Sequence, residues 1–164
     1  MKTEYGRLLQ VLVASHVDFI LVGGVAAAAH GSARATYDVD VLYARDSANI
    51  KRIVAALAPL QPYLRGAPAG LPFSWNTATL TAGLNFTLTT TIGDIDLLGE
   101  MTYGGSYEKF LPGSEIIEVF DIRCRCLSLD QLIAAKRAAG RRKDKDAIAE
   151  LEIIREEGAR PPSG

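Results

Sequence analysis

Hydrophobic and polar positions follow two different periods along this chain, which predicts a mixture of helices and strands. Apolar residues at helical spacing predict a helix from about 4 to 15, and the β-type run 18–22 ends at two glycines. The Ala-rich stretch 25–30 favours a second helix. Residues 37–43 alternate acidic with aliphatic side chains, as a strand with one polar face does.

The middle of the chain combines a capped helix, a proline-rich connection and a hairpin. Asp46 or Ser47 is placed to cap an apolar helix. A connection containing Pro59, Pro62, Pro68 and Pro72 follows. Apolar and polar side chains then alternate over 84–89, and Gly93-Asp94 has the composition of a hairpin turn before a strand at 95–98.

The last third of the chain predicts strands followed by helices. The expected elements are strands at 115–119 and 122–127 and helices at 129–139 and 143–156. Ser128 and Gln131 have the spacing of a capping box for the first of these helices. We therefore expect a single α+β domain over 1–157, with 128–157 as a helical C-terminal segment and 158–164 as a flexible tail.

The composition is that of an ordinary globular protein. The chain has 164 residues, of which 48% are hydrophobic and 23% charged, so it is long enough to bury a core and disorder is excluded as its main state. Lys and Arg number 18 against 19 Asp and Glu, for a net charge of -1. This balance argues against a basic surface that binds long nucleic acid.

A membrane or secreted protein is not expected from this sequence. The apolar stretch Phe19 to Ala29 is shorter than the roughly 20 residues that span a bilayer, and the N-terminus lacks the apolar core of a signal peptide. Cys124 and Cys126 are too close in sequence to bridge each other well, and two histidines make a Cys/His zinc site improbable. We therefore expect a cytoplasmic protein.

The most informative segment runs from a glycine pair to an aspartate pair. Gly23 and Gly24 let the backbone approach a ligand, and the N–H groups where the next helix begins attract anions. Asp38 and Asp40 are two residues apart on a predicted strand, so both carboxylates project from one face. Mg²⁺ takes oxygen ligands from carboxylates and phosphates, so this pattern favours a divalent-metal site beside a phosphate site.

Each half of this segment also has a plainer interpretation. A glycine pair after a strand is usually a tight turn, and alternating aspartates usually present a polar face to solvent. The combination is more informative than either half, because a phosphate site and two metal ligands would lie one short helix apart. The sequence contains no Walker A loop or dinucleotide-binding fingerprint that would compete with this interpretation.

The spacing resembles that of the polymerase-β-like nucleotidyltransferases. In that superfamily a strand ends in Gly-Gly or Gly-Ser and is followed, about a dozen residues later, by Asp-h-Asp-h, where h is apolar. Here thirteen residues separate Gly24 from Asp38-Val39-Asp40-Val41. The intervening His30-Gly31, Arg34 and Thr36 resemble the bacterial branch that includes AbiEii-like toxins and the minimal nucleotidyltransferases of toxin–antitoxin systems.

The resemblance implies a fold and a reaction. It implies a small mixed β-sheet flanked by helices, and transfer of NMP from an NTP to an acceptor with Mg²⁺ or Mn²⁺ as cofactor. It also implies that the phosphates contact Gly23, Gly24, Ser32 and Arg34, although Arg34 can instead tie down the loop before the aspartate strand. Relatives use protein hydroxyls, tRNA ends and small molecules as acceptors, and a cognate toxin or antitoxin is a candidate partner.

A third metal ligand is expected, and Asp94 and Asp96 compete for this role. Gly93-Asp94 has the chemistry of a tight turn, where Asp bonds to the local backbone. Asp96 lies between apolar Ile95 and Leu97, which would anchor its strand to the core. A metal ligand is best held by a rigid element, so we expect Asp96 beside Asp38 and Asp40 and Asp94 in the turn.

Lys136 is a further candidate for the site. It falls on the apolar face of its helix with Leu129, Leu132 and Ile133, where an unpaired charge is costly. It either extends outward to solvent or meets the triphosphate or an active-site acid. The cations that follow it, Arg137, Arg141, Arg142, Lys143 and Lys145, are most simply a solvated face and alternatively a contact for an RNA backbone.

Two other functions stay open at this point. One is a regulatory module, antitoxin-like, that binds nucleotide or is catalytically silent. The other is a structural domain in which the aspartate pair has no ligand. Binding of NTP and Mg²⁺ without transfer would favour the first, and the absence of any binding would favour the second.

Overall fold

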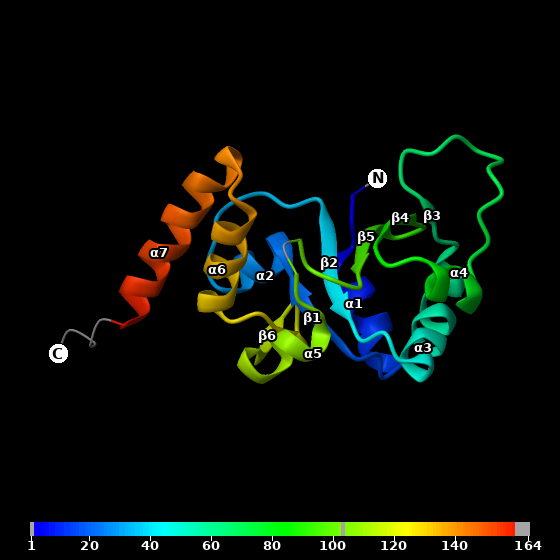
Figure 1. The fold of residues 1–164 in the computed structure, drawn as a ribbon, viewed down its shortest axis with the longest axis horizontal. Helices are drawn as coiled ribbons and strands as arrows, with labels where there is room; N and C mark the ends of the chain where they lie inside the picture. Colours follow the sequence, from blue (N-terminus) through cyan, green and yellow to red (C-terminus); the bar gives the residue numbers. More distant parts are fainter. Residues whose placement is uncertain (1, 103, 160–164) are drawn as a thin grey trace.

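A seven-stranded mixed sheet forms the centre of the computed structural model, which describes residues 2–102 and 104–159 (Figure 1). Its strands are β1 (Phe19–Val22), β2 (Asp38–Tyr43), β3 (Tyr63–Leu64), β4 (Phe86–Thr90), β5 (Gly93–Leu98), β6 (Glu115–Val119) and β7 (Ile122–Cys126). The helices are α1 (Tyr5–Ala14), α2 (Gly23–Ala29), α3 (Ser47–Leu57), α4 (Thr77–Ala82), α5 (Tyr107–Phe110), α6 (Leu129–Ala139) and α7 (Lys145–Ala159). Short 3-10 turns lie at Ala58–Leu60, Leu111–Gly113 and Arg142–Asp144.

The strand order is β3-β4-β5-β2-β1-β7-β6, which places β2 near the middle of the sheet. β2 pairs antiparallel with β1 and parallel with β5, with Asp40 opposite Val22 on one side and Asp96 on the other. β5 in turn pairs antiparallel with β4. Polar residues from three adjacent strands are therefore brought onto one face of the sheet.

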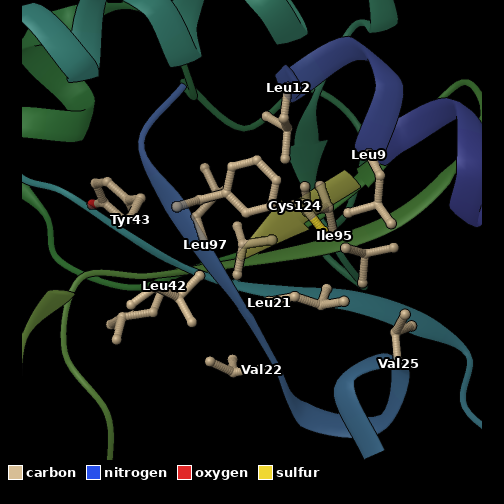
Figure 2. Close-up of a cluster of buried hydrophobic side chains, with 14 of the residues drawn as sticks. Leu9, Leu12, Leu21, Val22, Val25, Leu42, Tyr43, Ile95, Leu97 and Cys124 are labelled. Atoms are coloured by element: carbon tan, nitrogen blue, oxygen red, sulfur yellow. The ribbon is translucent and has the colours of Figure 1, made fainter. Parts of the chain in front are cut away.

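Both faces of β1 are covered, which explains why its sequence is continuously apolar rather than alternating. In Figure 2, Leu9 and Leu12 of α1 lie on the side of the sheet that carries Ile95, Leu97 and Cys124. Val22 lies on the other side of the sheet. Buried side chains therefore lie on both faces of β1, and the acidic side chains of β2 and β5 precede the apolar ends of these two strands.

The helices other than α1 and α5 lie in two groups at opposite ends of the molecule (Figure 1). α6 and α7 lie side by side at one end, near α2, whereas α3 and α4 lie at the other end with the long connection that follows β3 (Figure 1). Asp46, not Ser47, caps α3 by accepting a hydrogen bond from the Asn49 N–H. None of the helices in 2–102 and 104–159 is long and apolar enough to cross a membrane.

The expected fold class is confirmed, as is the capping box of Ser128 and Gln131. The expected turn at Gly93-Asp94 is wrong, because the turn lies at Thr91 and Ile92 and β5 already begins at Gly93. Thr90 replaces the anticipated Asp: its hydroxyl donates to the Gly93 carbonyl at 2.7 Å and accepts from the Ile92 N–H.

Three short elements were not anticipated from the sequence. β3 lies inside the proline-rich connection, and α4 and α5 are single-turn or two-turn helices without a long hydrophobic period. The last helix also continues through Gly158 and Ala159, two residues into the expected tail. Residues 160–164, the rest of that tail, lie outside the described residues.

Candidate active site

Three carboxylates meet at the polar face of the sheet. Asp38 and Asp40 extend from β2, and Asp96 extends from the parallel neighbour β5, directly opposite Asp40. One oxygen from each of the three lies within 4.8 Å of the others, close enough to share a metal ion. The structure thus places Asp96 beside the aspartate pair, and we call these three residues the Asp triad.

The electrostatics of the triad are those of carboxylates held close together and partly buried. Burial, followed by the charges of Asp38 and Asp96, raises the pKa of Asp40 to about 8. The pKa of Asp38 is also raised, first by burial and then by the charge of Asp96. Asp40 Oδ1 is buried and has no hydrogen-bond partner among the described residues. A cation at this position would offset both the repulsion and the missing partner.

Arg65, which sequence reasoning missed, supplies a positive charge to this site. It directly follows β3, and its Nη2 donates to Asp96 Oδ1 at 2.8 Å while Nη1 donates to Asp38 Oδ2 at 3.3 Å. Nη2 also donates to the Leu88 carbonyl of β4 at 2.7 Å, which fixes the guanidinium over the sheet. A signal for it exists in the sequence, since it is the only Lys or Arg between Arg52 and Lys109.

Asp94 is a strand residue on the same face as the triad rather than a turn residue. It pairs with Asp38 in the β2–β5 register, and its Oδ2 lies 3.3 Å from Arg65 Nε. It is not one of the three carboxylates that converge. Strand period alone places Asp94 and Asp96 on one face, but only the register shows that Asp96, and not Asp94, lies opposite Asp40.

The glycine pair makes room for the site. Gly23 has φ +69°, and a Cβ there would lie 2.0 Å from Asp40 Oδ2. A Cβ on Gly24 would lie 2.5 Å from the Thr36 hydroxyl. Any side chain at either position would displace the groups that face it, so the pair is required by packing whether or not it also contacts phosphate.

Other expected site residues gather in a cavity beside the glycine pair. Gly24, Ser32, Arg34 and Lys136 line a space of about 140 Å³ together with residues of α7. Within it, Ser32 and Arg34 both contact Glu150 of α7, with the Ser32 hydroxyl donating at 2.6 Å. The structure therefore brings three of the four expected phosphate residues, Gly24, Ser32 and Arg34, to one cavity, while Gly23 lines the neighbouring one. It also adds Glu150, which had no signal in the sequence.

Lys136 pairs with a carboxylate outside the triad. Its Nζ lies 3.7 Å from Asp144 Oδ1, and the Asp144 side chain, only 7% exposed, also accepts from Arg141 Nε at 2.6 Å. This pairing ties α6 to the start of α7. Lys136 also lines a second cavity of about 120 Å³ that contains Gly23, so it borders both spaces next to the glycine pair. A contact of Lys136 with phosphate stays a prediction.

His30 has a structural position at the end of α2. Its Nε2 lies 2.8 Å from the Leu127 carbonyl oxygen and donates to it, which joins α2 to the end of β7. The same nitrogen is 3.9 Å from Cys126 Sγ. Cys124 and Cys126 are both buried and free, and burial raises the pKa of each thiol.

Comparison with solved structures relates this architecture to a known fold. A protein of Thermotoga maritima, named a "putative nucleotidyltransferase", matches with a TM-score of 0.57 at 15% sequence identity. The match covers 92% of this chain and 94% of that one. No family model and no curated protein matches the sequence. The chain therefore has a nucleotidyltransferase-like fold, with a cluster of three aspartates at the face of its sheet that can hold a divalent metal.

Proposed function

We propose that this chain is a metal-dependent nucleotidyltransferase that transfers NMP from an NTP to an acceptor. The observation that carries the proposal is the Asp triad, in which three carboxylates converge and one buried oxygen of Asp40 lacks a partner. Such an oxygen-only donor set suits a hard divalent cation, Mg²⁺ or Mn²⁺. Asp38, Asp40 and Asp96 would hold the metal, which would neutralise charge on the transferring phosphoryl group.

The reaction needs little covalent chemistry from the protein. An acceptor oxygen attacks the α-phosphorus, a new O–P bond forms, and the bond to pyrophosphate breaks. The chain's contribution would be to orient the triphosphate along Gly23, Gly24, Ser32 and Arg34, with the α-phosphate toward the triad and Lys136 beside the glycine pair. Burial and the charges of the neighbouring aspartates raise the pKa values of Asp38 and Asp40, and a bound cation would oppose both effects.

A specific observation favours a second candidate, a nucleotide-binding or catalytically silent module. Arg65 pairs with Asp38, Asp94 and Asp96, so part of the charge that a metal would neutralise is already neutralised. If the guanidinium keeps this position permanently, the triad is a structural ion-pair network. If a cation displaces it or binds beside it at Asp40, the site is a metal site.

The acceptor and the biological setting are further parts of the proposal. The sequence resemblance to AbiEii-like and minimal nucleotidyltransferases supports a role in a toxin–antitoxin system, with a protein hydroxyl, a tRNA end or a small molecule as acceptor. The net charge of -1 is a mild argument against a long RNA. Incubating α-labelled NTPs with the protein and a lysate of its own source identifies the acceptor by what becomes labelled.

One set of variants distinguishes nucleotidyl transfer from nucleotide binding alone. Wild type, Asp40→Asn and the exposed control Asp130→Asn would be compared for thermal shift with each NTP and Mg²⁺, and for label transfer. We expect a thermal shift and label transfer in wild type and in Asp130→Asn, and neither of them in Asp40→Asn. A shift without transfer to any acceptor would favour the silent module, and full activity of Asp40→Asn would overturn the metal site.

A further inference from the structure

The loop that precedes β2 surrounds a carboxylate from α7 with hydrogen-bond donors. The Ser32 hydroxyl donates to Glu150 Oε1 at 2.6 Å, and the Ala33 N–H donates to Oε2 at 3.1 Å. Arg34 Nε lies 3.7 Å from Oε1. Both oxygens of Glu150 are therefore held by residues more than a hundred positions away in the sequence.

These donors are the types that proteins use for phosphoryl oxygens. A hydroxyl, a backbone N–H and a guanidinium recur in phosphate sites because each presents a proton to a negatively charged oxygen. The loop is ordered internally, since the Arg34 N–H donates to the Ser32 oxygen at 3.2 Å. Ser32 and Arg34 line the same cavity as Gly24 and Lys136, so this loop lies beside the second glycine of the pair.

We propose that residues 32–34 bind a phosphoryl group of the nucleotide, and that Glu150 is a built-in competitor that closes this site until the triphosphate displaces it. The identity of the ligand rests on the proposed function. The donors can hold one anion at a time, because a phosphoryl group and the Glu150 carboxylate would need the same protons and would repel each other.

Glu150 belongs to α7, a helix whose position can change when Glu150 is displaced. α7 lies at the end of the molecule against α6 (Figure 1), and Glu150 joins it to the loop before β2. The Glu150 side chain is 29% exposed, so water reaches the contact and assists exchange. Displacement of Glu150 would free α7 from the loop, so that nucleotide occupancy and the position of α7 change together.

Binding of inorganic tripolyphosphate in EDTA tests the loop without the metal. Titration calorimetry would compare wild type with Glu150→Gln, which removes the competing charge, and with Glu152→Gln. Glu152 is a matched control, because it lies on the same helix and pairs with Arg137 of α6 instead of the loop. We expect at least about tenfold tighter binding by Glu150→Gln and no change for Glu152→Gln, since only Glu150 competes for the donors.

Two further measurements test whether tripolyphosphate binds at residues 32–34. Adding Ser32→Ala to Glu150→Gln should weaken tripolyphosphate binding at least about fivefold, because one donor is lost. Hydrogen exchange over 145–159 should rise when tripolyphosphate is added to wild type, and should already be fast in Glu150→Gln. These readouts also detect a variant that fails to fold, which would lose protection throughout the chain.

The inference and the proposed function can fail separately. Equal affinity in wild type and Glu150→Gln, or no tripolyphosphate binding by either, overturns the inference, even where NTP transfer depends on Asp40. Tighter binding by Glu150→Gln together with label transfer that is indifferent to Asp40→Asn upholds the inference for the anion site and overturns the proposed metal-dependent reaction.

Discussion

Gly23 and Asp40 face each other so closely that a methyl group on Gly23 would lie 2.0 Å from Asp40 Oδ2. The contact arises because Val22, the last residue of β1, pairs with Asp40 of β2, and the chain turns into α2 immediately afterwards. The glycine that resembles a phosphate-binding residue in the sequence is thus also the residue that leaves space for a triad carboxylate. Position 23 requires glycine for two reasons, the space next to Asp40 and the positive φ. Comparison with a glycine that has only the positive φ separates them.

Gly23→Ala is expected to destabilise the protein more than Gly140→Ala. Both glycines have similar φ values, +69° and +61°, but a Cβ on Gly140 meets nothing within 4 Å. The positive φ alone costs about 1–2 kcal/mol in each variant, and Gly23→Ala adds the collision with Asp40. Thermal unfolding with and without Mg²⁺ checks this. We also expect Gly23→Ala to lose its Mg²⁺ response, and equal melting temperatures for the two variants would refute the steric role.

Asp40→Asn is expected to make the metal-free protein more stable than wild type, by a margin that grows as pH rises. The pKa of Asp40 is raised from 3.8 to about 8, so between these values the native state holds a proton that the unfolded chain has lost. Wild-type stability therefore falls over this window, and the Asn variant lacks that loss. The Tm advantage of the variant in EDTA should grow by at least about 2 °C between about pH 5.5 and about pH 8.5. A Tm difference independent of pH would contradict the raised pKa.

Arg65→Gln is expected to destabilise the metal-free protein and to be rescued by Mg²⁺. Removing the guanidinium leaves Asp38, Asp94 and Asp96 without their counter-charge, which costs about 1–3 kcal/mol for groups that are only partly exposed. Melting temperatures measured in EDTA and in Mg²⁺ test this. The control is Arg155→Gln, because Arg155 forms an exposed ion pair with Asp130, away from the triad. Loss of stability that Mg²⁺ does not restore would favour a permanent ion-pair network over a metal site.

Lys136→Ala is expected to weaken triphosphate binding, whereas Lys145→Ala is not. Lys136 borders both cavities beside the glycine pair, and Lys145 is exposed at the start of α7. Asp144 keeps Arg141 as a partner in the Lys136 variant, so we expect the fold to survive. Titration with tripolyphosphate compares the two, and a tenfold difference corresponds to about 1.4 kcal/mol. Equal effects would indicate a diffuse basic surface instead.

Local features of this protein could be predicted from its sequence because they depend on neighbours within a few residues. The period of two along β2 places Asp38 and Asp40 on one face in any fold that keeps the strand. The capping box of Ser128 and Gln131 is local in the same sense. The predicted turn at Gly93-Asp94 was wrong because the Thr90 hydroxyl makes the local backbone hydrogen bonds that were expected of the Asp94 carboxylate.

Contacts across the sheet were decided only by the tertiary structure. The sequence favoured Asp96 over Asp94 as the neighbour of Asp40, but because of a turn that does not exist. The geometric reason is the β2–β5 register, which pairs residues 56 positions apart, Asp40 with Asp96 and Asp38 with Asp94. Arg65 reaches the triad because β3 pairs with β4 at the edge of the sheet, and Glu150 meets Ser32 because α7 lies beside the loop that precedes β2. Hydrophobic periodicity reports which face of an element is buried but not which element covers it, so the isolated position of Arg65 in the sequence marks that residue but does not identify its partners.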